Sequence, residues 1–147
     1  MIRRLLAASA VLLLLSAARP MRAQSNYSFV VVVNVSNPTA ALPRSAVALL
    51  FLKRAAWSDG QRALPVDLRE DSQTRRDFTK LVHQKSIMAI RSYWQQQIFS
   101  GREVPPPEKR TDAEVLEFVR ANPNAIGYVS AAADLGDGVK ILNLTTK

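Results

Sequence analysis

The apolar run Phe29–Val33 constrains the fold more than any other stretch of the sequence. Continuous apolar, β-branched residues are typical of a strand that is covered on both faces, as in a parallel sheet. Asn34, Ser36, Asn37 and Pro38 follow the run, and these residue types favour a turn. We therefore predict that Phe29–Val33 is the central strand of a sheet with helices on both sides.

A second predicted strand, Leu64–Leu68, alternates apolar with other residues. A helix is predicted between the two strands. It starts near Pro43, and its apolar stripe consists of Val47, Leu50 and Phe51. Two strands joined by one helix favour a parallel pair with a right-handed crossover.

The remaining chain continues the alternation of helix and strand signals. Ser72 and Ser86 are predicted helix N-caps, and Thr111 with Glu114 forms a capping box. The proline-rich segment 102–110 predicts an extended surface loop. Strands are expected at 125–129 and 139–144. The sequence predicts a single three-layer α/β domain with a central, mainly parallel sheet flanked by helices.

The first residues differ from the rest of the sequence. Arg3 and Arg4 precede an uncharged apolar run from Leu5 to Ala18, and small residues follow it. This order is typical of a secretory signal peptide, and the run is shorter than the roughly 20 residues of a membrane-spanning helix. We predict a signal peptide at 1–23 and a domain at 24–147, with cleavage after Ala18 as the alternative to cleavage after Ala23. The mature protein would then be periplasmic or secreted, with no membrane insertion after cleavage.

The charge of the predicted mature domain is modest. The whole sequence carries a formal net charge of +8, and residues 1–23 hold four of its arginines and no acid, which leaves +4. Such a balance, with acids interspersed, does not favour nucleic-acid binding. The sequence contains no cysteine, so an exported domain would depend on its core rather than on disulfides.

The stretch 66–78 runs from the second strand directly into a helix whose first turn contains Ser72, Gln73, Thr74 and Arg75. The first backbone N–H groups of a helix have no intrahelical partner, and the helix dipole is positive there. The two hydroxyls and the guanidinium would add side-chain donors. This turn is therefore a candidate anion site, although an ordinary capped surface helix would have the same local sequence.

Three separated motifs resemble the periplasmic phosphate-binding proteins of ABC transporters. They are Leu50-Phe51-Leu52-Lys53 with Trp57-Ser58-Asp59-Gly60, then Val66-Asp67 leading to Ser72-Gln73-Thr74-Arg75 and Phe78, and finally 122–129, Asn-Pro-Asn-Ala-Ile-Gly-Tyr-Val. Their order and spacing also resemble the family. The resemblance implies one lobe of a type 2 periplasmic binding protein.

The resemblance also implies a ligand and partners. Phosphate or a similar oxyanion would bind Ser72, Gln73, Thr74 and Arg75, and a membrane permease or other envelope protein would be the partner. Ser36 and Asn37 are predicted at the rim for a different reason: ligands of open α/β sheets lie beyond the carboxyl ends of the strands, and both loops would leave predicted parallel strands at that end. The family has glycine at the position of Gln73, which lets the backbone approach the anion closely. Its first lobe precedes the strand equivalent to Phe29–Val33, and we expect no such lobe in this chain, so the anion would meet only half of the usual donors. We therefore expect the isolated domain to bind its anion with a Kd of about 10 μM to 1 mM.

Other chemistry receives little support from the sequence. His83 is the only histidine, and no multi-histidine metal site, catalytic triad, Walker A loop or dinucleotide fingerprint is present. We predict no enzymatic activity, no cofactor and no metal. An alternative function is a protein-interaction or structural module of the cell envelope that keeps the periplasmic-binding-protein-like fold without binding a ligand.

Overall fold

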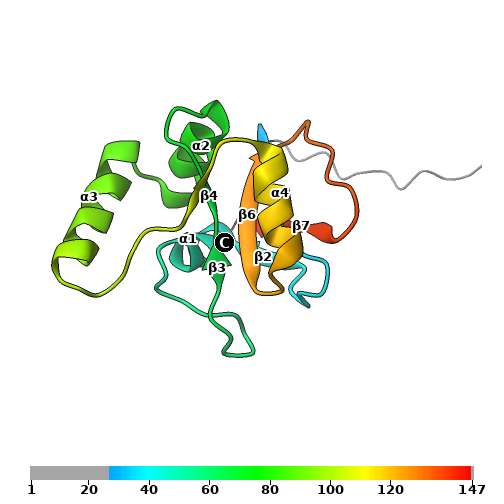
Figure 1. The fold of residues 1–147 in the computed structure, drawn as a ribbon, viewed down its shortest axis with the longest axis horizontal. Coiled ribbons are helices and arrows are strands. Elements are labelled where there is room, and N and C mark those ends of the chain that lie inside the picture. The colour runs from blue at the N-terminus through cyan, green and yellow to red at the C-terminus, as the bar shows by residue number, and fades with distance from the viewer. Residues whose placement is uncertain (1–26, 147) are drawn as a thin grey trace, which may run out of the picture.

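The computed structural model describes residues 27–146 and consists of a curled sheet flanked by helices (Figure 1). The predicted signal peptide lies outside the described residues. The strands are β1 (Phe29–Asn34), β2 (Ala41–Pro43), β3 (Leu64–Pro65), β4 (Asp67–Leu68), β5 (Glu108–Lys109), β6 (Ala125–Ser130) and β7 (Val139–Thr145). The helices are α1 (Arg44–Phe51), α2 (Gln73–Phe78), the π-helical η1 (Thr79–His83), α3 (Ile87–Phe99) and α4 (Asp112–Ala121).

The main sheet has the strand order β2-β7-β1-β6-β3, so β1 is its centre as predicted. Every residue of β1 is buried. However, β1 is antiparallel to both of its neighbours, β6 and β7, while only the outer pairs β2–β7 and β3–β6 are parallel. The expectation of a mainly parallel sheet is therefore wrong in strand direction, although the α/β class is confirmed. Burial on both faces produces the apolar run, and helices can bury an antiparallel strand equally well.

The predicted pairing of Phe29–Val33 with Leu64–Leu68 is also wrong, because β6 lies between β1 and β3. The predicted second strand is itself divided. Leu64 and Pro65 pair with β6, whereas Asp67 and Leu68 pair with β5 in a separate two-stranded sheet. Strand β5 forms the end of the segment that we expected to be loop throughout. The chain thus leaves the main sheet at Val66, just before the predicted site.

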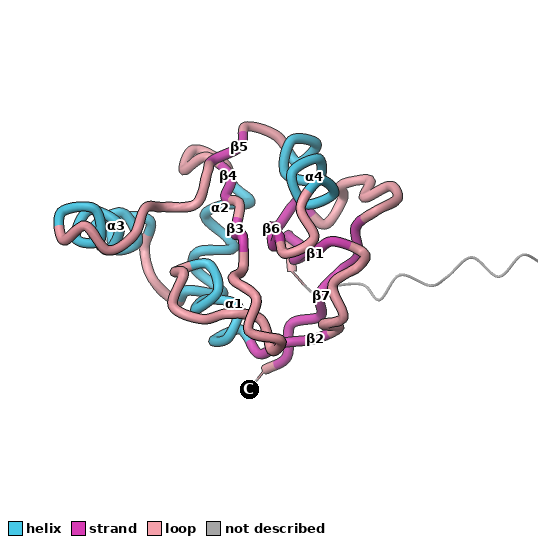
Figure 2. The backbone as a smooth tube through the Cα atoms, turned by 60° about the horizontal axis from the view of Figure 1, so that its bottom comes forward, coloured by secondary structure: helices cyan, strands magenta, loops and turns pink. Residues whose placement is uncertain are grey.

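Helices lie on both sides of β6 (Figure 2), and successive side chains of a strand point to opposite faces of the sheet. On one face, Tyr128 stacks on Phe78 of α2 with ring centroids 3.8 Å apart and an interplanar angle of 5°. On the other face, a Cβ atom at Gly127 would lie 2.8 Å from Val115 of α4, so glycine allows this helix to approach closely. These contacts confirm the predicted three-layer arrangement.

The predicted helix starts are correct. The hydroxyls of Ser72 and Ser86 accept hydrogen bonds from the backbone N–H groups of Arg75 and Ala89, at 3.4 and 3.1 Å. Thr111 likewise accepts from the N–H of Glu114 at 3.2 Å. Figures 1 and 2 show that α3 stands away from the main sheet, whereas α1, α2 and α4 pack on it.

Candidate functional site

The candidate site is the turn between β4 and α2, which we call the β4–α2 turn and define as residues 69–74. The N–H of Ser72 donates to the carbonyl of Arg69 at 3.0 Å and closes the turn. Ser72 and Thr74 are half-buried, and Gln73 is exposed. The hydroxyl of Ser72 accepts the cap hydrogen bond, so its own O–H is still able to donate.

The side chain of Gln73 is engaged in hydrogen bonds with two side chains of its own helix. Its amide donates to Asp77 at 2.7 Å and its carbonyl oxygen accepts from Arg76 at 2.9 Å. Both partners lie further along the same helix. One end of the Gln73 side chain is thus held along the helix by Asp77, and the other is held by the Arg76 guanidinium, which also donates to the carbonyl of Asp71.

Arg75 is placed differently from the prediction. Its side chain is buried, with a relative exposure of 5%, and it forms an ion pair with Asp67. It also donates to the carbonyl of Leu68 at 3.0 Å. The guanidinium is thus engaged below the turn, and Asp67 balances its positive charge without a ligand.

A buried network surrounds this ion pair. The hydroxyl of Tyr128 donates to Asp67 and accepts from the N–H of Leu68 at 3.3 Å. Burial raises the pKa of Asp67 above its ordinary value, against the opposing charge of Arg75. Burial, and then the Asp67 charge, raises the pKa of Tyr128 well above its ordinary value. The network fastens β4, α2 and β6 to one another beneath the turn.

Two arginines near the turn were missed by the sequence reasoning. Arg76 is exposed, and its guanidinium reaches back to the carbonyl of Asp71 at 2.9 Å. Arg91 comes from α3 and forms an ion pair with Glu70. The placement of Arg76 could have been found from its helical spacing after Ser72. Arg91 lies 21 residues from Glu70, and no local signal indicates that contact.

Ser36 and Asn37 do not join this turn, which corrects the predicted rim. Val33 on β1 pairs with Ile126, and Pro65 on β3 pairs with the same residue. Because β1 and β3 run in opposite directions, the carboxyl end of β1 lies at the end of the sheet where β3 begins. The β4–α2 turn lies at the opposite end of the sheet.

The residues around Ser36 have a structural role. The Asn34 side chain accepts from the N–H and the hydroxyl of Ser36, at 2.9 and 2.7 Å, and donates to the carbonyls of Val119 and Arg120, each at 3.0 Å. Asn37 is buried and accepts from the N–H of Thr39 at 2.9 Å. These side chains satisfy backbone groups of the loop and of the α4 end.

His83 lies in η1, and its ring packs edge-on against the rings of Phe51 and Phe78. Burial lowers its pKa to about 4, and the charges of Arg75 and Lys85 add to this effect. The ring is therefore neutral near pH 7. Within residues 27–146 no group of three or more histidine or acidic side chains is arranged to hold a metal ion.

No protein-family model matches this sequence, and no curated protein matches it. Solved structures do. The fold is similar to an ABC-type phosphate transport receptor from Vibrio cholerae, with 20% identity, a TM-score of 0.61 and coverage of 80% of this chain and 46% of the receptor.

Two further structures are similar to the same extent. A Clostridium perfringens protein, described as a phosphate ABC transporter substrate-binding protein and solved with bound phosphate, has 18% identity and a TM-score of 0.62 over 82% of this chain and 46% of its own. PstS from Borrelia burgdorferi has 12% identity and a TM-score of 0.62 over 82% and 48%. The chain thus spans a little less than half of each, which matches a single lobe. At these identities the similarity establishes the fold.

In the part of the chain that the structure describes, no helix is long and apolar enough to cross a membrane.

Proposed function

We propose that this domain is an exported binding module that takes phosphate or a similar small oxyanion at the β4–α2 turn. The observation that carries the proposal is the half-buried pair of hydroxyls, Ser72 and Thr74, on an accessible turn of a fold shared with phosphate receptors. Backbone N–H groups of Gln73 and Thr74 are the other donors. A membrane permease or another envelope protein is the proposed partner.

The roles of the neighbouring side chains follow from their contacts. Arg75 holds the turn through its ion pair with Asp67 and is a positioning residue rather than a ligand. Arg76 is the cation that an anion at this turn would meet, because its guanidinium lies along the carbonyls of the turn. Glu70 and Asp71 lie on the same turn and oppose an anion. We therefore expect a Kd of about 10 μM to 1 mM.

Calorimetric titration with phosphate, sulfate and acetate tests this proposal. The double variant Ser72→Ala with Thr74→Ala should lower the affinity for phosphate at least about tenfold, since it removes two hydroxyl donors. Ser86→Ala is the matched control, because the Ser86 hydroxyl caps α3 as that of Ser72 caps α2, and Ser86 is not part of the turn. Unchanged affinity in the double variant would overturn the assignment of the site.

A second candidate function, an envelope interaction module without a ligand, is favoured by one observation. Arg75, which the sequence predicted as a ligand of the anion, is already neutralised by Asp67, and the pair is buried. This function predicts no saturable binding of any of the three anions up to about 10 mM, with the fold intact by circular dichroism. The same titration therefore separates the two functions.

A further inference from the structure

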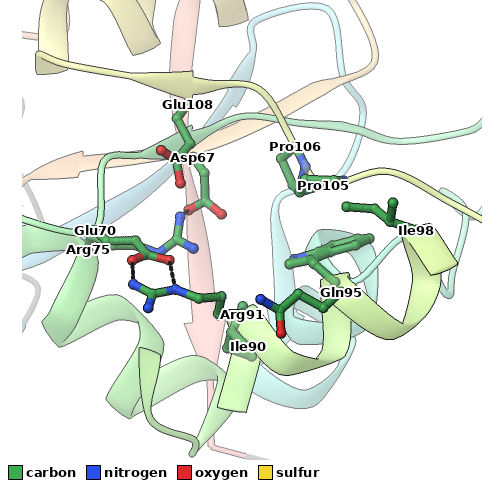
Figure 3. Close-up of a pocket in the computed structure, with 11 residues that line it drawn as sticks. Asp67, Glu70, Arg75, Ile90, Arg91, Gln95, Ile98, Pro105, Pro106 and Glu108 are labelled. Carbon is green, nitrogen blue, oxygen red and sulfur yellow. Dashed lines mark hydrogen bonds and ion pairs between the residues drawn. The ribbon is translucent and has the colours of Figure 1, made fainter. Parts of the chain in front are cut away.

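A cavity lies beside the β4–α2 turn, between α3 and the small β4–β5 sheet (Figure 3). Its volume is about 190 Å³. Pockets for drug-sized ligands have volumes of about 300 to 1,000 Å³. This cavity is smaller, and it fits a single amino-acid side chain or a small molecule of similar size. Ser72 and Thr74 do not line it. Of the β4–α2 turn only Glu70 lines it, so the hydroxyls of the proposed oxyanion site lie outside the cavity.

One wall of the cavity is apolar. Ile90, Trp94 and Ile98 follow one another along α3, and Pro105 and Pro106 lie opposite them. Trp94 is buried, with a relative exposure of 6%, whereas Ile98 is 53% exposed. An aliphatic stem entering past Ile98 would be shielded from water by the indole and the prolines.

The other wall carries an excess of negative charge. Two of its acids are balanced, Asp67 by Arg75 and Glu70 by Arg91. Glu108 on β5 forms no ion pair with any residue that the structure describes, and it lines the same wall. The wall thus has three carboxylates and two guanidinium groups. This surplus repels an anion and suits a cation.

The carboxylate of Asp67 has a free face toward this space. Its interactions with Arg75 and Tyr128 all involve Oδ1. Among residues 27–146 its second oxygen has no hydrogen-bond partner, and Figure 3 shows that oxygen turned away from Arg75 into the space below Pro105 and Pro106. The residue as a whole has a relative exposure of 5%, so the cavity is the direction in which this oxygen can be reached.

We propose that the cavity binds a primary alkylammonium group. The ammonium contacts the second oxygen of Asp67 and the carboxylate of Glu108, and the aliphatic stem lies against Trp94 and Ile98. An ammonium donates three hydrogen bonds and is compact, which suits a space of this size. Its attraction to an aromatic face adds to the fit. A free amine and a lysine side chain of another protein share this chemistry.

Nuclear magnetic resonance titration with n-pentylammonium chloride tests the inference. Saturable shifts around Trp94, with a Kd of about 1 to 10 mM, are expected. The uncharged n-pentanol should bind at least about tenfold more weakly, since it lacks the charge. Equal binding of n-pentanol, or no saturable shift with n-pentylammonium, would overturn the inference.

The variant Glu108→Gln removes the surplus charge without breaking an ion pair. We expect it to weaken n-pentylammonium binding about threefold to tenfold. Glu117→Gln, at an exposed position on α4, is the matched control and should leave the affinity unchanged. An unchanged affinity in Glu108→Gln would contradict the inference. Phosphate binding should be retained in both variants, so a failure here is distinct from a failure of the oxyanion proposal.

A second ligand distinguishes the two sources of the ammonium. N-acetyl-lysine methylamide presents the side chain as a protein would. If it binds at least as tightly as n-pentylammonium, the lysine of a partner protein is supported. If its added backbone prevents binding while n-pentylammonium still binds, a free amine is supported.

Discussion

The two ends of the central sheet use polar side chains in different ways. At the end where β1 leaves the sheet, the amides of Asn34 and Asn37 are buried and engaged with backbone groups. At the opposite end, Ser72 and Thr74 are half-buried on a turn held from below by the Arg75–Asp67 pair. Polar residues after a strand thus indicate a ligand site only where their hydrogen-bonding capacity is not already used by the fold.

The largest expected effect is a loss of stability when the buried ion pair at the β4–α2 end is broken. Arg75→Met should destabilise the domain by about 3 to 5 kcal/mol, because it leaves Asp67 buried without its counter-charge. Urea unfolding monitored by tryptophan fluorescence measures the change. The double variant Arg75→Met with Asp67→Asn should recover part of the loss. A loss below about 1 kcal/mol in the single variant would show that the pair does not hold the turn.

A change in pH should also alter the stability of the domain, through His83 of η1. The pKa of His83 is about 4 in the folded protein, against 6.5 when unfolded, so the unfolded state binds more protons between these values. Stability should therefore fall as the pH is lowered from 6.5 to 4, by at most about 3 kcal/mol. Asp67 has a raised pKa and acts in the opposite direction.

The variant His83→Leu isolates the histidine contribution. Denaturant unfolding at several pH values should give a smaller pH dependence for this variant than for the wild type between pH 4 and 6.5. Identical pH dependence in both proteins would contradict the assigned neutral state of the ring.

The β1 end should respond to loss of its amides with lower stability and no change in ligand binding. Asn34→Ala removes hydrogen bonds to two carbonyls at the end of α4 and should cost about 1 to 3 kcal/mol. Thermal unfolding measures the loss, and phosphate titration of the same variant should give the wild-type Kd. Weaker phosphate binding would show that the two ends are coupled.

The smallest expected effect concerns Gln73. Because its side chain is bonded to Asp77 and Arg76, Gln73→Gly should change the affinity for phosphate less than about threefold. Gln96→Gly, on the exposed face of α3, controls for the general cost of glycine in a helix. A gain of tenfold or more in phosphate affinity would show that the Gln73 side chain obstructs the turn.

Local signals in the sequence were sufficient for much of this fold. The caps Ser72, Ser86 and Thr111 depend on contacts within four residues, and each predicted helix begins where its cap indicates. The burial of Phe29–Val33 follows from its composition. Strand direction depends on which distant strands pair, and the same apolar run is compatible with either direction.

The same distinction explains the candidate site. Ser72, Gln73 and Thr74 are neighbours in sequence, so their shared turn could be predicted. The separation of Ser36 and Asn37 from that turn follows from the antiparallel pairing of β1 with β6, which no local pattern specifies. The burial of Arg75 depends on Asp67 and Tyr128, and the Tyr128 contact spans 61 residues.

Titration of the ¹⁵N-labelled domain with phosphate, followed by amide chemical shifts, tests directly whether the anion binds at the β4–α2 turn. We expect saturable shifts at Ser72, Gln73 and Thr74 with a Kd of about 10 μM to 1 mM, and none at Ser36 and Asn37. The Ser72→Ala with Thr74→Ala variant should lose these shifts. Shifts confined to Ser36 and Asn37, or no saturable shift at any residue, would contradict binding at this turn.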